Sequence, residues 1–450
     1  MSGIARVLHD RGVKVTGSDL RLSRYAAALQ EAGVTVHIGH DAGNLGDAEL
    51  VVVSTAIPQT NPELVEAKRR GLDIWPRARM LAELAGDLKT VAVAGTHGKT
   101  TTSSMTAAAL IACGLDPTFL IGGEINDVGS NARCGTGQYY VVEADESDGS
   151  FLLLDPYCAI VTNIEADHLD HYGSLAEIVA TFVEFLARLR PDGVAVLCAD
   201  DPILPGLAAA CPARVVTYGR AADADVRMTR FRPEEGGTRF ELAFPDGTTV
   251  EGATIVPGEH MALNATGVLA AAWALGLDVR QAAEGVAAFG GVKRRFEAVG
   301  SHAGVDVVDD YAHHPTEVRA TLAAAKSGGR RRVWAIFQPH RYSRTAALGD
   351  EFGAAFDDAD RVVLMDVYSA GEAPIPGISG KTVLDALLRH SPRKRVAYFP
   401  HRADVAGYVA AGVRAGDLVM TMGAGDVTTM GPEVVRELVT RGPRSGDTCP

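Results

Sequence analysis

One eight-residue segment of the chain has the residue types and spacing of a phosphate-binding loop. It reads Gly95-Thr96-His97-Gly98-Lys99-Thr100-Thr101-Thr102 and lies between an apolar run at 91–94 and a helix-like run at 103–112. Glycines allow backbone N–H groups to face phosphate oxygens, and the start of a helix adds favourable partial charge. The lysine can reach the β- and γ-phosphates of a nucleotide, and the following threonine hydroxyl can bind Mg²⁺. The segment therefore predicts a cradle for a nucleoside triphosphate.

The spacing of the two glycines narrows the type of loop. Only Thr96 and His97 separate Gly95 from Gly98, whereas the general P-loop has four residues between its glycines. An ordinary strand-to-helix turn with a chance Lys-Thr pair is the alternative. The apolar run before the segment and the helix-like run after it favour the phosphate cradle.

Side chains that can bind a metal follow two apolar runs downstream of the cradle. Glu143-Ala144-Asp145-Glu146-Ser147-Asp148 follows 139–142, and Asn163-Ile164-Glu165-Ala166-Asp167-His168-Leu169-Asp170-His171 follows 158–161. Open α/β sheets bind ligands at the carboxyl ends of their strands, and Mg²⁺ prefers carboxylate and water oxygens. The alternative for the first segment is a solvated acidic loop. In the second segment His168 is well placed, but Asp167, Asp170 and His171 compete for its role, and spacing alone does not choose.

Histidine, arginine and tyrosine residues gather at two further predicted strand ends. The segments are Asp309-Asp310-Tyr311-Ala312-His313-His314-Pro315-Thr316-Glu317 and Gln338-Pro339-His340-Arg341-Tyr342-Ser343-Arg344-Thr345. Arg341 and Arg344 can fork onto a carboxylate or a phosphate. The alternative is a pair of helix starts capped by Thr316 and Thr345, with solvated charges. The clustering favours a site. The basic run 293–295 lies at a predicted domain junction and is either a phosphate clamp or a solvated face.

Three α/β units are predicted to position these residues. Strand-like and helix-like runs alternate in 1–87, which predicts a parallel sheet. That unit opens with a helix at 1–10, so we expect a first strand and a glycine loop ahead of Met1. The second unit, 88–297, holds the cradle, and the third is 298–450. The strands that we expect are 13–17, 34–38, a buried strand at 50–54, 139–143, 158–164, 193–198, short strands within 224–255, 305–308, 333–337, 361–365 and 418–420.

Composition places the chain among globular proteins and limits its partners. Its 450 residues allow two to four domains, and 47% apolar with 22% charged residues is typical of a packed core with a charged surface. The net charge of −13 argues against nucleic acid as a partner. The six cysteines include no Cys-x-x-Cys pair, and no apolar run is long enough to span a bilayer. We therefore expect a cytoplasmic protein without membrane insertion, either a monomer or a homodimer.

Together these segments resemble the motifs of the Mur ligases, the ATP-dependent amino-acid ligases of peptidoglycan synthesis, and especially of their alanine-adding branch. The resemblance covers nearly the whole chain. Further matching stretches are Met1-Ser2-Gly3-Ile4-Ala5, Gly17-Ser18-Asp19-Leu20, Arg294-Arg295-Phe296, 366–377 and Met422-Gly423-Ala424-Gly425-Asp426. The resemblance implies an α/β protein of three domains. These are a Rossmann-like UDP-sugar-binding domain (1–87) whose first strand is missing, a central P-loop ATPase-type domain (88–297) and a Rossmann-like amino-acid-binding domain (298–450).

The resemblance also implies roles for individual residues. ATP would be bound by Gly95, Thr96, His97, Gly98, Lys99, Thr100, Thr101, Asn264 (adenine), Arg295 (phosphates) and Asp310 (ribose). Mg²⁺ would be held by Thr100, Glu143 and His168, and the catalytic residues would be Lys99, Glu143, His168 and Arg295. The substrates UDP-N-acetylmuramate and L-alanine would contact Ser54, Thr55, Tyr311, His313, Arg341 and Arg344.

The implied reaction joins L-alanine to the lactyl carboxylate of UDP-N-acetylmuramate through an acyl phosphate. One alternative is a recycling ligase that attaches an intact peptide to the same sugar nucleotide. Another is an ATP-binding protein that is inactive because the N-terminal glycine loop is lost. Relatives often carry Asn where this chain has Met261, which leaves Asn264 for adenine. The absence of lysine from 169–187 argues against the sister ligases that use a carbamylated lysine.

Overall fold

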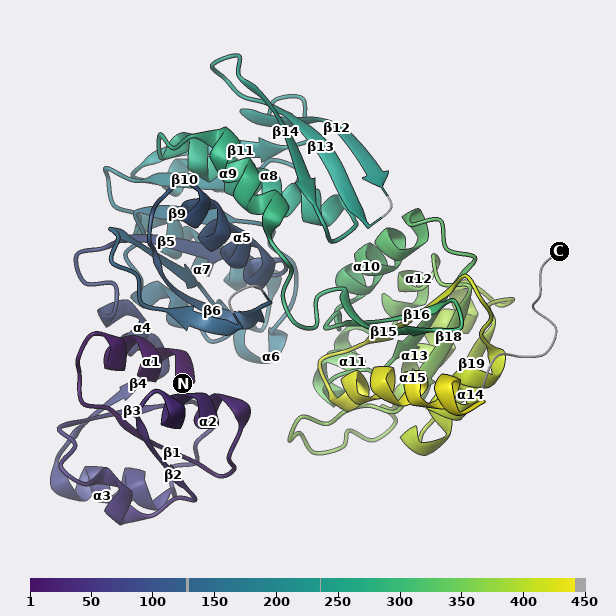
Figure 1. Ribbon diagram of the computed structural model, residues 1–450, viewed down its shortest axis with the longest axis horizontal. Coiled ribbons are helices and arrows are strands. Elements are labelled where there is room, and N and C mark those ends of the chain that lie inside the picture. Colours follow the sequence, from purple (N-terminus) through teal and green to yellow (C-terminus); the bar gives the residue numbers. More distant parts are fainter. Residues whose placement is uncertain (127–128, 235, 442–450) are drawn as a thin grey trace.

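The computed structural model describes residues 1–126, 129–234 and 236–441. It contains three α/β regions that follow one another along the chain (Figure 1). The purple N-terminal region lies below the central region in this view, and the green-to-yellow C-terminal region lies to its right. Among the described residues, no helix is long and apolar enough to cross a membrane. The three-region α/β architecture confirms the predicted fold class.

The N-terminal region contains two separate parallel sheets of two strands each. One pairs β1 (Thr16–Asp19) with β2 (Thr35–Ile38), and the other pairs β3 (Leu50–Val53) with β4 (Asp73–Pro76). Its helices are α1 (Ser2–Asp10), α2 (Arg24–Glu31), α3 (Pro62–Arg70) and α4 (Arg77–Glu83). The parallel pairing is as predicted, but β3 is half-buried rather than buried. A strand in a two-stranded sheet has a neighbour on one side only, so less of it is covered.

The central region is built on a single ten-stranded sheet with the order β14-β13-β12-β11-β10-β9-β5-β8-β6-β7. Its strands are β5 (Lys89–Ala94), β6 (Thr118–Ile125), β7 (Ser130–Arg133), β8 (Tyr139–Glu143), β9 (Cys158–Val161), β10 (Val194–Cys198), β11 (Arg214–Gly219), β12 (Val226–Glu234), β13 (Gly237–Ala243) and β14 (Thr249–Thr254). Its helices are α5 (Lys99–Ala112), α6 (Leu169–Tyr172), α7 (Leu175–Ala187), α8 (Glu259–Ala274) and α9 (Val279–Ala288). Pairing is parallel along the run β12-β11-β10-β9-β5-β8-β6, whereas β7 pairs antiparallel with β6, and β13 pairs antiparallel with both β12 and β14.

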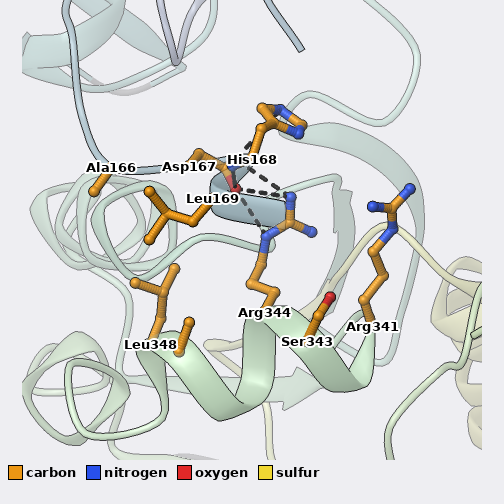
Figure 2. A pocket seen from close by; sticks show the side chains of 9 residues that line it. Ala166, Asp167, His168, Leu169, Arg341, Ser343, Arg344 and Leu348 are labelled. Atoms are coloured by element: carbon orange, nitrogen blue, oxygen red, sulfur yellow. Dashed lines mark hydrogen bonds and ion pairs between the residues drawn. The ribbon is translucent and has the colours of Figure 1, made fainter. Parts of the chain in front are cut away.

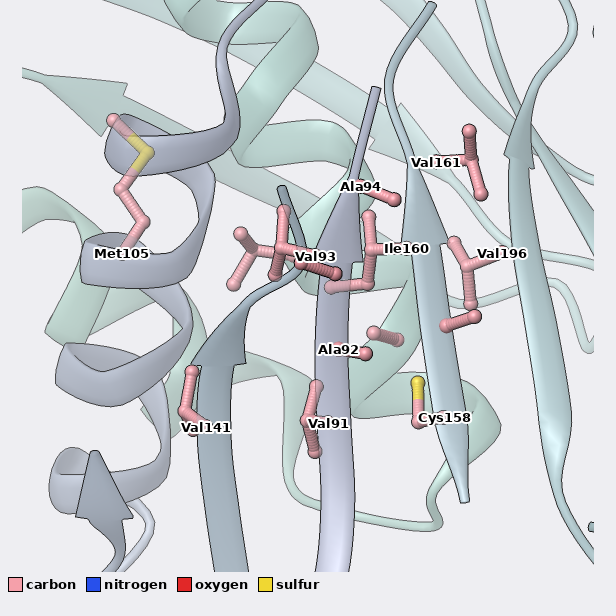
Figure 3. Packing of buried hydrophobic residues seen from close by; sticks show 14 of the residues in the cluster. Val91, Ala92, Val93, Ala94, Met105, Val141, Cys158, Ile160, Val161 and Val196 are labelled. Carbon is pink, nitrogen blue, oxygen red and sulfur yellow. The ribbon is translucent and has the colours of Figure 1, made fainter. Parts of the chain in front are cut away.

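The middle of this sheet is fully buried. Val91, Ala92, Val93 and Ala94 of β5 have no exposed surface. Figure 3 shows them between the side chains of β8 and β9, with Met105 of α5 alongside. A parallel strand that is covered on both faces reads as a continuous apolar run, which is why the sequence predicted β5, β8 and β9 well. Each buried valine or isoleucine stabilises the fold by about 1.5–3 kcal/mol, so the ends of these strands are firmly held.

The C-terminal region has a six-stranded sheet with the order β15-β16-β20-β17-β18-β19, parallel except for β15. Its strands are β15 (Glu297–His302), β16 (Val305–Asp310), β17 (Arg332–Phe337), β18 (Arg361–Met365), β19 (Val396–Phe399) and β20 (Asp417–Met422). Its helices are α10 (Pro315–Ser327), α11 (Tyr342–Leu348), α12 (Phe352–Ala355), α13 (Gly380–His390), α14 (Val405–Gly412) and α15 (Met430–Arg441).

Alternate residues of β17 enter two different cores. Val333, Ala335 and Phe337 pack with α10 to α13, whereas Trp334 and Ile336 pack with α14 and α15. Helices therefore cover both faces of the sheet, as in a Rossmann-like domain.

Several strands were not predicted, namely β4, β6, β7, β11, β15 and β19. Most of them lie near a sheet edge, where one face or one side is exposed and the apolar run is interrupted. The predicted strand 13–17 begins too early, because β1 spans Thr16–Asp19 and its pairing with β2 starts at Thr16. The proposed boundaries at 87/88 and 297/298 stay predictions, and residues 442–450 of the third unit lie outside the described part of the chain.

Candidate functional site at the phosphate cradle and the junction with the C-terminal region

Both glycines of the cradle are required by its backbone. Gly95 has φ +128°, and a Cβ there would lie 2.1 Å from Thr162 Oγ1. Gly98 has φ +83°, and a Cβ there would lie 2.8 Å from Asn264 Oδ1. Side chains at these positions would be strained and would also clash with their neighbours. The same contact places Asn264, which is buried in α8, directly against the cradle.

The loop is braced by the residues that follow β9. Thr96 N–H donates to the Asn163 carbonyl (3.0 Å), and His97 N–H donates to Asn163 Oδ1 (2.8 Å). Thr162 Oγ1 donates to the His97 carbonyl (2.6 Å). Helix α5 starts immediately afterwards at Lys99. The first N–H groups of a helix have no intrahelical acceptor, so this turn presents them where a phosphate would lie.

Lys99 is held by an internal carboxylate. Its Nζ lies 2.8 Å from the Glu146 carboxylate and donates to the Gly95 (2.7 Å) and Thr96 (3.2 Å) carbonyls. Burial raises the pKa of Glu146 to about 7. Burial works to lower the pKa of Lys99, but Glu146 and Asp145 outweigh it, so the ammonium stays charged. Glu146 thus supplies the negative charge that balances the Lys99 ammonium. The acidic motif pointed to this loop, but nothing in it distinguished Glu146 from its neighbours.

Thr100 and Glu143 lie together at the end of β8. Thr100 Oγ1 donates to Glu143 Oε1 (3.0 Å), and Gly122 N–H donates to Glu143 Oε2 (2.7 Å). Neighbouring oxygen ligands of octahedral Mg²⁺ are about 2.8–3.0 Å apart when its bonds are about 2.0–2.1 Å. The two oxygens therefore fit a single Mg²⁺ ion, in both chemistry and spacing.

The structure separates the candidates in the segment after β9. His168 has φ 53° at the start of α6, and its Nε2 lies 3.6 Å from Asp167 Oδ2. Burial lowers the pKa of His168, so its imidazole is neutral and can donate a lone pair to a metal. His171 is exposed and packs edge-on against Tyr172. The side chain of Asp170 lies outside what the structure describes.

Asp167 pairs with Arg344 across two regions of the molecule. Arg344 Nη2 lies 3.0 and 3.3 Å from the two Asp167 oxygens, and Nε lies 3.2 Å from Oδ1. Figure 2 shows Arg344 rising from α11 to meet Asp167 in a pocket that His168 and Arg341 also line. Burial works to raise the pKa of Asp167, but Arg344 outweighs it and holds that pKa well below its usual range.

The alternative interpretation, in which threonines cap the two C-terminal helices, is wrong. His314 caps α10, because its Nδ1 accepts from the Thr316 N–H (3.3 Å), while Glu317 accepts from the His314 N–H. Arg341 stands at the cap position of α11, and Thr345 Oγ1 donates to its carbonyl (2.8 Å). Arg344 is buried rather than solvated, which removes the alternative of a solvated face for that residue.

A second group of predicted residues surrounds Tyr311. The guanidinium groups of Arg294 and Arg295 lie 4.9 and 5.2 Å from its ring centroid. The His313 ring meets it edge-on at 5.3 Å, and burial lowers the pKa of His313 to about 3. Asp310 accepts from the Phe296 and Ala312 N–H groups (2.8 Å each), and burial raises its pKa to about 6. Asp310 thus shapes this turn, and its proposed contact with ribose stays a prediction.

The predicted substrate residues of the N-terminal region lie in a separate turn. Ser54 and Thr55 follow β3, where the Ser54 carbonyl accepts from the Ile57 N–H (3.0 Å) and its Oγ accepts from the Ala56 N–H (3.4 Å). The structure thus brings together the cradle, Glu143, His168 and the C-terminal cluster more clearly than it does Ser54 and Thr55. Met261 is buried in α8, one turn before Asn264.

The chain belongs to the Mur ligase family. The family models described as "Mur ligase family, catalytic domain", "Mur ligase middle domain" and "Mur ligase, glutamate ligase domain" match residues 1–88, 93–272 and 294–425. The chain is 47% identical to a UDP-N-acetylmuramate–L-alanine ligase of Syntrophotalea carbinolica, over 98% of this chain and 96% of that protein.

Two solved structures share the whole fold. The UDP-N-acetylmuramate-alanine ligase of Thermotoga maritima has a TM-score of 0.81 and 29% identity, and the match covers 98% of this chain and 97% of that one. A murein peptide ligase of Psychrobacter arcticus has a TM-score of 0.71 and 26% identity, with 97% and 96% covered. Both the fold and the sequence therefore place the chain among ATP-dependent ligases.

Proposed function

We propose that the chain joins L-alanine to the lactyl carboxylate of UDP-N-acetylmuramate, with ATP as the energy source. The observation that carries the proposal is the junction at which the phosphate cradle meets the arginine and histidine cluster of the C-terminal region. ATP phosphates bound at the cradle would face groups that can hold an amino acid and a carboxylate. The similarity to alanine ligases along nearly the full chain supports the same activity.

In the proposed reaction the lactyl carboxylate attacks the γ-phosphorus, ADP leaves and an acyl phosphate forms. The amine of L-alanine then attacks the acyl carbon, and phosphate leaves. The first step brings two anions together, so positive charge must surround them. Lys99 supplies it once the phosphates displace Glu146, and Arg295 supplies it from the C-terminal side. No side chain has to become covalently bonded to the substrate.

Thr100 and Glu143 would hold Mg²⁺, with His168 as a further ligand. When bound, Mg²⁺ would neutralise phosphate and carboxylate charge. Asn264 lies against the cradle and would contact adenine, while Arg341, Arg344, Tyr311 and His313 would surround alanine and the muramoyl end. Ser54 and Thr55 would contact the UDP-sugar. We further propose that the protein acts in the cytoplasm, where its proposed substrate ATP is made.

The test is a mass-spectrometric assay of this chain with ATP, Mg²⁺, UDP-N-acetylmuramate and either L-alanine or a tripeptide. An alanyl adduct together with ADP is the expected result. A tripeptide adduct alone would assign the chain to peptide recycling. ATP binding without any adduct would contradict ligase activity for this chain and favour a nucleotide-binding role.

A further inference from the structure

Three ligand atoms converge beside the cradle, apart from the proposed Mg²⁺ ligands. His97 of the cradle, Glu165 after β9 and His314 at the start of α10 each place one such atom within 4.8 Å of the others. His97 Nε2 lies 3.6 Å and His314 Nδ1 lies 3.7 Å from Glu165 Oε2. These separations are too long for hydrogen bonds. They are close to the edge of about 3.3–3.4 Å between ligands of a tetrahedral Zn²⁺ ion with bonds of about 2.0–2.1 Å.

Outer groups already orient these side chains as they would around a metal. Glu317 Oε1 lies 3.3 Å from His97 Nδ1, and Thr316 Oγ1 donates to Glu165 Oε2 (2.6 Å). Histidine ligands of metals usually give their second ring N–H to a carboxylate, which fixes the tautomer and the ring direction. Glu317 does this for His97 and leaves its Nε2 facing Glu165.

The burial of the two rings makes their unmatched polar atoms costly. The side chain of His314 is 2% exposed, and the ring centroids of His97 and His314 are 4.6 Å apart. Among the described residues, His97 Nε2 has no hydrogen-bond partner. His314 Nδ1 accepts a long hydrogen bond from the Thr316 N–H (3.3 Å), which a bound ion would replace. A buried imidazole nitrogen without a partner, beside a carboxylate, is a position at which a cation is stabilised. Glu165 is 34% exposed and gives an ion access from solvent.

We propose that His97, Glu165 and His314 form a site for Zn²⁺ that fastens helix α10 of the C-terminal region to the phosphate cradle. Two imidazole nitrogens and one carboxylate suit Zn²⁺, with a fourth position for water, whereas Mg²⁺ prefers oxygen ligands. Since the ligands come from two regions, the bound ion holds these regions in the arrangement seen here. The site does not depend on the proposed ligation reaction.

The test titrates the whole chain with Co²⁺, a coloured probe for tetrahedral zinc sites, in a large excess of Mg²⁺, and then displaces Co²⁺ with Zn²⁺. We expect one Co²⁺ per chain with the intense visible absorption of a tetrahedral ion. His314→Asn keeps a helix-capping side chain and should weaken binding by at least about tenfold, because it removes a ligand. Glu165→Gln should do the same. His171→Asn, at an exposed ring, is the matched control and should bind Co²⁺ as the wild type does.

Binding that is unchanged in His314→Asn and Glu165→Gln would overturn the proposal, as would a weak octahedral spectrum. Loss of binding in His168→Asn alone would assign the ion to the proposed Mg²⁺ site instead. Circular dichroism and thermal unfolding of the metal-free variants show whether each one folds. If His314→Asn does not fold, Co²⁺ binding by Glu165→Gln tests the proposal, because Glu165 is partly exposed and its replacement disturbs the fold less. The alanine ligation assay is run separately, so that a failure of the proposed function is distinguished from a failure of the zinc site.

Discussion

Charged side chains form ion pairs both in the phosphate cradle and at the junction with the C-terminal region. The two partners belong to one region in the cradle and to two regions at the junction. In the cradle, Lys99 and Thr100 meet Glu146 and Glu143, 47 and 43 residues away, at the ends of adjacent strands of one sheet. At the junction, Asp167 and Arg344 are 177 residues apart and belong to two regions. The ion pairs of the cradle therefore form within one region, whereas the junction exists only while the two regions are in contact.

Removing the cradle cation should have the largest effect. Lys99→Ala deletes the charge that neutralises the phosphates, so kcat/KM for ligation should fall by at least about 10³-fold, or about 4 kcal/mol. Nucleotide affinity should fall as well. The exposed Lys381→Ala in α13 is the control for the loss of a lysine. Near-normal turnover of a folded Lys99→Ala variant would contradict the cradle assignment.

Variants of two nearby histidines test which of them is the metal ligand beside the cradle. Asparagine tolerates the left-handed backbone of His168, so His168→Asn should fold and lower Mg²⁺-dependent turnover by about 10²-fold. His171→Asn alters an exposed ring, so its Mg²⁺-dependent turnover should stay within about twofold of that of the wild type. Turnover measured across a Mg²⁺ titration checks both. Equal losses would mean that the wrong histidine has been chosen.

The pH dependence of stability probes the contact of His97 with both regions. The pKa of His97 is raised from 6.5 to about 9 in the folded protein. Its contribution is therefore fully present below pH 6.5 and is lost as the pH rises through about 9. For the metal-free protein the loss should amount to about 3 kcal/mol. Thermal unfolding over this range should show a steeper decline for wild type than for His97→Gln, and parallel curves would contradict the charged pairing.

A smaller change should affect the junction alone. Arg344→Lys keeps the charge but loses the forked contact with Asp167, so kcat/KM should fall by about 10-fold, or about 1.4 kcal/mol. ATP affinity, measured by calorimetry, should stay at the wild-type value, unlike that of Lys99→Ala. Arg389→Lys, on the exposed face of α13, is the matched control. An equal loss of ATP affinity would show that the two sites are not separable.

Local patterns predicted much of the fold and part of the site. The buried parallel strands β5, β8 and β9 were predicted because burial on both faces requires unbroken apolar runs. Edge strands such as β7 and β19 were missed, because their residues face mixed surroundings. Thr316 was the alternative candidate for the cap of α10, but the folded chain uses His314, whose ring is packed against His97. Capping by a threonine is a local preference, and tertiary packing overrode it.

The sequence by itself determined the phosphate cradle, because its glycines, lysine and threonine are contiguous and their backbone requirements are local. It also indicated that acidic and histidine residues directly follow buried strands. Only the tertiary structure decided that Glu146 pairs with Lys99, that Asp167 pairs with Arg344, and that His97, Glu165 and His314 meet. Several side chains of one loop are equivalent in sequence, and only packing decides which of them is buried against an opposite charge.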